Sequence, residues 1–465
     1  MIATARQAIR WALRHALFRR AMQQRVRAGE LGAGLILDPA MVADPYPHYD
    51  ALRAQGRLVP TGVAYSTAHH DVCTAVLRSP DFGTVAAASG PLPGLFGKVV
   101  RAAGRGPIGP VEPPSMLAVD PPDHTRYRKL VTRAFSARAV AALRTRTETI
   151  AAELLDAMAA RGDRADVVRD YASLLPATVI VEMLGAPVEM RRQFLEWGAG
   201  GALSLDAGLS YRDFRRSERD LAALQAWMLA HFESVRRSPG DDILSALVTA
   251  HDEGQADGDE QRLTSDELTS IAMLLLAAGF ETTVNLIGNG VALLVEHPDQ
   301  LALLRADPQR WRGAVDEILR IDPPVQRTGR LAVRDTVVAG ERVRAGRAVI
   351  TLLGGANRDP AVFAEPHRFD VLRENAGEHI AFSSGIHYCL GAGLARMEGE
   401  VALRALFERF PDLALARPPH RRPTRVLRGY DAMPASPAPT SVPACRSPAP
   451  GRAQYGGKRR QPQAS

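Results

Sequence analysis

Cys389 is the side chain in this sequence whose surroundings best suit chemistry at a sulfur atom. Glycines lie close to it at positions 385 and 391, and an apolar spacing typical of a helix starts at Leu390. A thiolate at a helix N-terminus is stabilised by the helix dipole and by free backbone N–H groups. The flanking glycines allow the backbone to fold around the sulfur and to approach a flat ligand. The segment therefore predicts a ligand-binding thiolate at position 389.

The chain has two other cysteines, Cys73 and Cys445, and all three are far apart. No CxxC pair is present, so the sequence excludes both a zinc cluster and a disulfide framework. This cysteine usage is typical of a reducing cytoplasm. We interpret Cys73 and Cys445 as small apolar residues, because a lone cysteine is most often a small buried hydrophobe.

Residues at fixed spacing surround the central cysteine: Phe382, Gly385, His387, Cys389, Gly391, Leu394 and Ala395. This segment resembles the haem-binding loop of the cytochrome P-450 superfamily. The resemblance implies that Cys389 is the iron ligand and that Phe382, Gly385 and Gly391 lie against the haem. The sequence departs from the family pattern at Ser383, where most bacterial members have glycine. A serine at this position is expected to change the hydrogen bonding near the sulfur. It does not alter Cys389, the expected iron ligand.

Glu317 and Arg320 are three residues apart, so both side chains lie on one face of a predicted helix and can pair. Taken alone, such a pair is most often a solvated surface pair. It resembles, however, the E-x-x-R element of the same family, and Arg368 resembles the third member of that ionic cluster. The resemblance implies a structural role, since a buried charge needs its partners.

The segment from Leu268 to Val295 is long, apolar and interrupted by a single charged residue, Glu281. Its length would suit a membrane span. Polar residues and glycines break its apolar character, however, and no second span exists. We therefore predict a helix that runs through the protein interior.

Residues 278–283 of that helix read Ala-Gly-Phe-Glu-Thr-Thr and resemble the oxygen-activation segment of the family. The resemblance implies that Glu281 and Thr282 are catalytic groups. A carboxylate and a hydroxyl side by side on a buried helix can relay protons. It also implies that Ala278 and Gly279 lie beside the cofactor.

The cofactor implied is haem b, iron protoporphyrin IX, which carries two propionate carboxylates. By the same resemblance, four basic residues bind the propionates: His124, Arg128, Arg330 and His387. His124 and Arg128 are four residues apart and share a helix face. Two prolines stand near the first turn of that helix, where proline is common. Arginine suits this role because charge-assisted hydrogen bonds to carboxylates are strong.

The elements that must position these groups are mainly helical. Apolar residues recur every three or four positions over 124–160, 216–237, 266–296, 300–320 and 390–410. Strand patterns are short, at 58–65 and at 337–350, where Ala-Gly pairs at 339–340 and 345–346 predict two turns. A Gly/Pro-rich stretch at 89–114 predicts a long loop. The predicted fold class is mainly α, and the resemblance implies the cytochrome P-450 fold, a large helical domain with a small β-rich subdomain.

The net charge of +7 is concentrated at the two ends of the 465-residue chain. Residues 1–29 carry seven arginines, and residues 432–465 carry five basic residues; neither segment has an acid, which leaves −5 for residues 30–431. A mildly acidic body excludes a nucleic-acid-binding core. We divide the chain into a basic N-terminal extension (1–30), a haem domain (31–431) and a disordered tail rich in Pro, Ala and Arg (432–465).

The N-terminal extension lacks the apolar core of a signal peptide. We interpret it as a frayed or loosely docked segment, in preference to the weak peripheral membrane contact that residues 1–29 would permit. No transmembrane span is expected, and a cytoplasmic location follows.

The resemblance implies a haem-thiolate monooxygenase, which inserts one oxygen atom from O2 into a C–H bond of a hydrophobic small molecule by hydroxylation or epoxidation. No flavin or iron–sulfur domain fits this length, so electrons must come from outside. Soluble bacterial members usually use a ferredoxin and its ferredoxin reductase. Two alternatives remain open: a peroxide-dependent or isomerase variant of the fold, and a non-catalytic haem-binding sensor. The intact acid–alcohol pair at 281–282 argues against the first of these.

Overall fold

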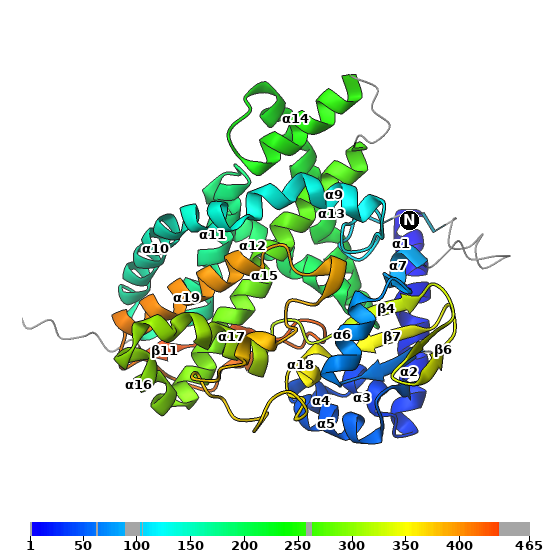
Figure 1. Ribbon diagram of the computed structural model, residues 1–465. Coiled ribbons are helices and arrows are strands. Elements are labelled where there is room, and N and C mark those ends of the chain that lie inside the picture. The colour runs from blue at the N-terminus through cyan, green and yellow to red at the C-terminus, as the bar shows by residue number, and fades with distance from the viewer. Residues whose placement is uncertain (1, 62–63, 89–102, 105, 257–262, 437–465) are drawn as a thin grey trace, which may run out of the picture.

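The long apolar segment forms helix α15 (Ser265–Glu296), which runs through the helical part of the computed structural model (Figure 1). The structure describes residues 2–61, 64–88, 103, 104, 106–256 and 263–436. Thr264 begins α15 through a capping box with Glu267, and the helix ends before Pro298. Among the described helices, α15 alone is long and apolar enough to cross a membrane, and 78% of its apolar stretch is buried inside the protein. It is the core helix that the sequence predicts.

Helices bury α15 on several sides. Those in contact with it include α11 (Leu174–Met183), α12 (Arg191–Ala202), α13 (Tyr211–Arg237), α14 (Ile243–Ala256), α16 (Pro298–Ala306), α17 (Trp311–Ile321) and α19 (Ala392–Arg409). Two hydrophobic cores meet along α15. One packs against its residues up to Phe280, and the other packs against its residues from Val284 onward. Residues 281–283 therefore lie where the two cores meet.

Two of the predicted helices are each divided in the structure. The stretch 124–160 forms α9 (Asp123–Thr132) and α10 (Ala137–Ala159), because the Ser136 side chain accepts from the Ala139 N–H and starts a second helix. The stretch 300–320 likewise forms α16 and α17, separated by a 3-10 turn that Asp307 caps. The helices predicted at 216–237, 266–296 and 390–410 are confirmed as α13, α15 and α19.

A small five-stranded sheet lies to one side of the helices (Figure 1). Its strands, in spatial order, are β1 (Val59–Thr61), β2 (Ala64–Thr67), β7 (Ala348–Thr351), β4 (Thr328–Ala332) and β3 (Phe82–Gly83). β2 and β7 pair in parallel, with Ser66 opposite Ile350, and the other pairs are antiparallel. Short helices adjoin this region: α3 (Leu31–Leu37), α4 (Pro39–Ala43), α5 (Tyr46–Gln55), α6 (His70–Arg78), α7 (Val85–Ala88) and α18 (Leu353–Ala356).

The predicted strands and turns at 337–350 are confirmed. β5 (Thr336–Val338) and β6 (Glu341–Val343) form a hairpin around Ala339 and Gly340, both with positive φ, and Gly346 has a φ of 80° before β7. Strand β4 has no counterpart in the predictions. It carries Arg330, so the sheet positions a residue that the sequence pattern placed on no element.

The N-terminal segment is docked on the helical domain through specific contacts. Helices α1 (Ile2–Trp11) and α2 (Leu17–Arg27) are joined by a π-helical turn. Arg10 makes a two-point ion pair with Glu218 of α13, at 2.8 and 2.7 Å, and the side chains are 13% and 10% exposed. Trp11 Nε1 donates to the Leu209 carbonyl at 3.0 Å. The prediction of a frayed or loosely docked segment is therefore wrong. The sequence pattern could not show this docking, because the partner residues lie about two hundred residues away in the chain.

The C-terminal boundary also needs correction. Residues 432–436 continue into strands β10 (Tyr430–Ala432) and β11 (Ala435–Ser436), which pair with β9 (His420–Arg421) and β8 (Ala414–Leu415). Met433 is fully buried, and its backbone N–H donates to the Asp166 carboxylate. The predicted disordered tail therefore starts too early. Residues 437–465 and most of the loop predicted at 89–114 lie outside the described residues.

Candidate active site

Cys389 lies in the turn between a short 3-10 segment (Gly385–His387) and α19. Its backbone N–H donates to the Phe382 carbonyl at 2.9 Å, which closes the loop around it. Gly385 has a φ of 70°, and a Cβ there would lie 2.3 Å from the carbonyl oxygen of Leu77, so this position requires glycine. The loop thus places Cys389, an exposed residue, immediately before a helix N-terminus.

Ser383, where the sequence departs from the family pattern, has a φ of 64°. Glycine adopts this left-handed conformation without strain, whereas a serine does so rarely. Its hydroxyl oxygen is buried and lacks a hydrogen-bond partner. Nearby, the Arg396 guanidinium lies over the Phe382 ring, 4.6 Å from its centre. The departure therefore places a strained backbone and a buried hydroxyl in this loop.

The environment of the Cys389 thiol suits a bound metal cation. Although part of the residue is accessible, the protein atoms packed around it raise the pKa of its thiol. The Gly391 N–H and the guanidinium groups of Arg128 and Arg396 act in the opposite direction. A coordinated metal ion deprotonates a cysteine thiol outright and so overcomes the effect of burial. Cys73, by contrast, is fully buried in a hydrophobic cluster, as expected of a small apolar residue, and Cys445 lies outside the described residues.

Four basic residues predicted to bind propionates lie together beside this loop. The His124 and His387 rings are 4.2 Å apart, centre to centre, and the Nε2 atoms of both are buried without a hydrogen-bond partner. Burial, together with the charges of Arg330, His124 and Arg128, lowers the pKa of His387 to about 3. Arg128 of α9 donates to the Tyr388 carbonyl at 2.6 Å.

Arg330 of β4 completes the cluster. It is 7% exposed, and burial lowers its pKa while Asp120 raises it. Asp120 lies 3.8 Å from His387 and also accepts from the Thr84 N–H. Buried nitrogen atoms without partners, next to two arginines and a cysteine turn, fit a flat group with two carboxylates and a metal cation. An iron porphyrin is such a group.

The middle of α15 contains a small accessible patch. Between Leu268 and Ala292 its residues are buried, except for 277–279 and Thr282. Ala278 and Thr282 are four residues apart and share one face, and the Thr282 hydroxyl donates to the Ala278 carbonyl at 3.2 Å. Gly279 is close to α11, since a Cβ there would lie 2.7 Å from Ile180 Cγ1. An accessible hydroxyl thus stands on an otherwise buried helix.

Glu281 is adjacent to Thr282 in sequence but lies in different surroundings. Its side chain is 5% exposed and forms an ion pair with Arg422 from the C-terminal part of the chain. Neighbouring helical residues point about 100° apart, so the buried acid and the accessible hydroxyl face different sides of α15. The predicted acid–alcohol pair is present, and its acid has a partner that the sequence analysis missed.

The ionic cluster at Glu317 is confirmed in two of its three members and corrected in the third. Glu317 and Arg320 are both fully buried and pair through two hydrogen bonds of 2.6 and 2.8 Å. Arg373 is the third member, with its Nε 3.3 Å from Glu317 and a side chain 9% exposed. Arg368 is 56% exposed and pairs with Glu365; it offers only its backbone carbonyl, which accepts from Arg320. The turn at 365–368 directs the Arg368 side chain outward.

Glu398 is a buried titratable residue that the sequence analysis missed, although it interrupts the apolar spacing of α19. It is 1% exposed, and burial raises its pKa to about 8, a rise that the Thr283 hydroxyl opposes. The group therefore favours its neutral form on the helix that follows Cys389. Thr283 belongs to α15, so the Glu398 carboxyl lies where α19 packs against the middle of α15.

The raised pKa of Glu398 predicts a stability that falls as the pH rises. An unfolded glutamate ionises near pH 4.5, whereas the folded side chain ionises near pH 8, so between these values the unfolded state releases a proton first. Stability should fall across this window by about 1.4 kcal/mol for each unit of pKa difference. Glu398→Gln should remove the fall. Chemical denaturation at several pH values measures it, and Glu408→Gln, an exposed acid on the same helix, is the control. Parallel pH curves for Glu398→Gln and the unsubstituted protein would contradict the assignment.

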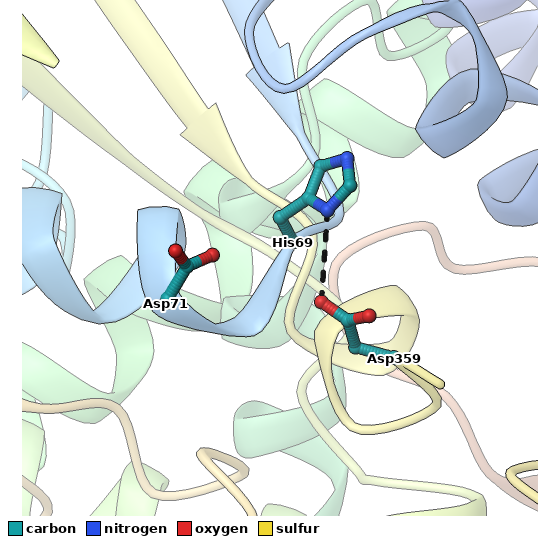
Figure 2. Close-up of side chains that lie close together, drawn as sticks. All are labelled: His69, Asp71 and Asp359. Carbon is teal, nitrogen blue, oxygen red and sulfur yellow. Dashed lines mark ion pairs between the residues drawn. The ribbon is translucent and has the colours of Figure 1, made fainter. Parts of the chain in front are cut away.

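A second cluster, of His69, Asp71 and Asp359, is the one group of metal-ligand residue types that the described part of the chain brings together. Figure 2 shows the ion pair between His69 and Asp359, 3.7 Å apart, with Asp71 outside it. Asp359 accepts from the backbone N–H groups of 70 and 361, and Asp71 pairs with Arg57. These contacts occupy the carboxylates, so the cluster links the start of α6 to the chain after α18.

The known proteins to which this chain is similar are cytochromes P450. The family model of cytochrome P450 matches residues 207–422. A "Putative cytochrome P450 140" of Mycobacterium tuberculosis is 46% identical over 431 residues, which cover 93% of this chain and 98% of that protein. The 6-deoxyerythronolide B hydroxylase of Saccharopolyspora erythraea is 46% identical over 325 residues, covering 69% and 77%. The ligand-free structure of Mycobacterium smegmatis CYP164A2 superposes with a TM-score of 0.77 at 35% identity, covering 87% and 99%.

The fold and the cysteine site together define a haem-thiolate protein. The chain belongs to the cytochrome P450 family, and both the resemblance and the fold class predicted from the sequence are confirmed. It is a P450 monooxygenase, an oxidoreductase that binds haem iron, takes electrons from an external redox partner and acts on a small molecule.

Proposed function

We propose that this monooxygenase binds haem b through Cys389 and hydroxylates or epoxidises a hydrophobic small molecule with one oxygen atom of O2. The observation that carries the proposal is the cysteine turn beside a cluster of two arginines and two histidines, in which the buried Nε2 atoms of both histidines lack hydrogen-bond partners. When bound, the haem would supply the oxygen-activating chemistry, and a thiolate ligand from Cys389 would favour it. A relative named as a hydroxylase supports the hydroxylation.

The chain's own residues then have separate tasks. Cys389 Sγ holds the metal, and His124, Arg128, Arg330 and His387 bind the propionates through charge-assisted hydrogen bonds. Phe382, Gly385 and Gly391 shape the loop on the cysteine side, and Ala278 and Gly279 form the accessible backbone on the other side. Thr282 Oγ1 donates a proton at the reaction site, and the Glu281 carboxyl restores it.

A ferredoxin, reduced by a ferredoxin reductase, is the redox partner that we propose. Ile386 and Tyr388 on the cysteine loop are 51% and 41% exposed. Arg128 connects this loop to α9, and the exposed cations Lys129 and Arg133 follow it in the chain. An apolar tip beside cations complements an acidic electron carrier. Such a partner is consistent with a cytoplasmic enzyme.

Isotopically labelled O2 distinguishes this function from its alternatives. With a ferredoxin, its reductase and a substrate found by spectral titration of a compound library, the product should carry one labelled atom. A peroxide-dependent variant would take its oxygen from added peroxide instead, and an isomerase would incorporate none. A haem-binding sensor would show tight ligand-dependent spectral shifts without turnover. Any of these three outcomes would refute the monooxygenase mechanism.

Thr282→Ala should retain haem but form roughly a hundred-fold less product per NADPH, with more peroxide released, because one proton donor of this kind contributes about that factor or more. The measurement is the ratio of product to NADPH consumed. Thr149→Ala is the matched control, since its hydroxyl makes the same bond to the carbonyl four residues earlier on α10. Unchanged coupling in Thr282→Ala would remove this residue from the proton relay.

A further inference from the structure

A small cavity between helices α3–α5 and the chain around β9 is lined by an unusual number of cations. Its volume is about 20 Å³, and no carboxylate of the described chain lines it. Five of its lining residues are arginines: Arg327, Arg421, Arg422, Arg425 and Arg428. Like charges brought together away from bulk water repel one another strongly, so this arrangement needs negative charge nearby.

Three of the five arginines have a carboxylate partner outside the lining. Arg421 Nη2 donates to Asp322 Oδ2 at 2.9 Å, and Arg428 Nε donates to Asp322 Oδ1 at 2.8 Å. Arg422 forms its ion pair with Glu281. Since Asp322 carries one negative charge and is shared by two guanidinium groups, these three arginines keep one positive charge in excess.

The side chains of the other two arginines donate to backbone carbonyls. Arg327 Nη2 donates to the carbonyls of Leu35 and Arg425, at 3.1 and 3.2 Å, and Arg425 Nη1 donates to the Ala207 carbonyl at 2.9 Å. These bonds satisfy donors and fix the side chains in place. A carbonyl oxygen has no net charge, however, so both guanidinium charges remain.

Asp206 is the acid nearest to these two arginines, and its oxygens are bound by backbone groups. It is 4% exposed and accepts from the backbone N–H groups of Arg425 and Val426. Burial lowers the pKa of Arg425; the charge of Asp206 opposes this, while those of Arg327 and Arg19 add to it. Counting Asp206 as a full counter-ion, five cations face three carboxylates, which leaves two positive charges unmatched.

Arg421 also has a donor that the described chain leaves free. Its Nη1 is buried and lacks a hydrogen-bond partner, while the guanidinium group lies over the Tyr430 ring, 4.3 Å from its centre. A buried charged donor without an acceptor is costly, so a ligand that accepts from this nitrogen would be favoured. The excess positive charge requires that ligand to be an anion.

We propose that this cavity is a binding site for one monatomic anion, chloride, held among the five guanidinium groups with Arg421 Nη1 as a donor. A cavity holds a water molecule when its volume reaches about 10–15 Å³, so this one accepts an ion of about that size. A five-atom anion such as sulfate is too large for it. The bound ion connects α3–α5 to the chain around β9, and it therefore stabilises the folded state.

Urea unfolding of the full-length haem-bound protein tests the site. Chloride is varied at fixed ionic strength by exchange against gluconate, so that general screening stays constant. If one ion binds the folded state alone, the unfolding equilibrium constant should fall about ten-fold for each ten-fold rise in chloride above its dissociation constant. Arg421→Gln should abolish this dependence. Arg417→Gln, which removes an exposed arginine from the same part of the chain, should keep it. The same dependence in Arg421→Gln, or none in the unsubstituted protein, would overturn the proposal.

Bromide, which scatters X-rays anomalously, locates the ion independently of any substitution. Crystals of the unsubstituted protein soaked in bromide should show an anomalous peak within the cavity, so the proposal stays testable if Arg421→Gln does not fold. Absence of that peak would refute the site. A peak without the chloride dependence of unfolding would indicate an adventitious ion only and would equally refute it. Sulfate, exchanged in the same way, should not stabilise the protein; stabilisation as steep as that by chloride would contradict the assignment of a monatomic ion.

Discussion

Cys389→Ser is expected to lose the carbon-monoxide difference band of thiolate-ligated haem completely and to have no monooxygenase activity. A serine hydroxyl stays protonated near neutral pH, so it supplies no anionic ligand and none of the electron donation that an axial thiolate gives. Because the loop is closed by the backbone bond from Cys389 N–H to Phe382, the fold should survive the change. The measurement is the difference spectrum of the reduced protein, together with its circular dichroism.

Cys73→Ala is the matched control for this substitution. The Cys73 thiol is buried and lies 3.5 Å from the Thr67 carbonyl, in a hydrophobic cluster with Leu77 and Leu353. Alanine is also small and apolar, so this variant should keep the full band at a modest cost in stability. A band that persisted in Cys389→Ser, or vanished in Cys73→Ala, would show that the ligand is assigned to the wrong cysteine.

Arg320→Ala is expected to lower the free energy of unfolding by about 3–5 kcal/mol, because it leaves the fully buried Glu317 carboxylate without its main partner. Arg320 also donates to the carbonyls of Asn357, Pro366 and Arg368, so its loss frees the chain that precedes the cysteine loop. Denaturant unfolding of the haem-free and haem-bound protein measures the change.

Arg373 and Arg368 provide an internal comparison for the same cluster. Arg373→Ala removes a largely buried second donor to Glu317 and should cost about 1–3 kcal/mol. Arg368→Ala removes an exposed side chain and should cost less than about 0.5 kcal/mol. Equal losses for the two variants would contradict the correction that the structure makes to the sequence-based assignment.

Much of the site was predictable because its signals are local. The residues around Cys389 form one continuous loop whose glycine at 385 is required by its own φ. The spacing of Glu317 and Arg320 depends only on the period of a helix. The Ala-Gly turn at 339–340 was likewise predictable, since positive φ angles there follow from the turn itself.

The rest of the site depends on contacts between distant segments. Arg368 and Arg373 are five residues apart, and only the path of the intervening turn decides which side chain reaches Glu317. Arg330 stands on a strand too irregular in pattern to be predicted, and its place is set by pairing with β7. The pKa of Glu398 is raised because its side chain is buried. The sequence shows a glutamate within the apolar spacing of α19, but only the packing of the helices shows that it is buried.

The sequence by itself determined the thiol at 389 and the long core helix with a carboxylate and a hydroxyl in its middle, because short-range spacing and residue chemistry specify these. The basic residues for the propionates were expected from the family resemblance alone. Only the tertiary structure decided that Glu281 pairs with Arg422, that the basic N-terminal helices dock through Arg10 on Glu218, and that Arg373 completes the ionic cluster. The physical reason is that a buried charge is stabilised by whichever opposite charge the packing brings to it, and packing joins residues that sequence distance keeps apart.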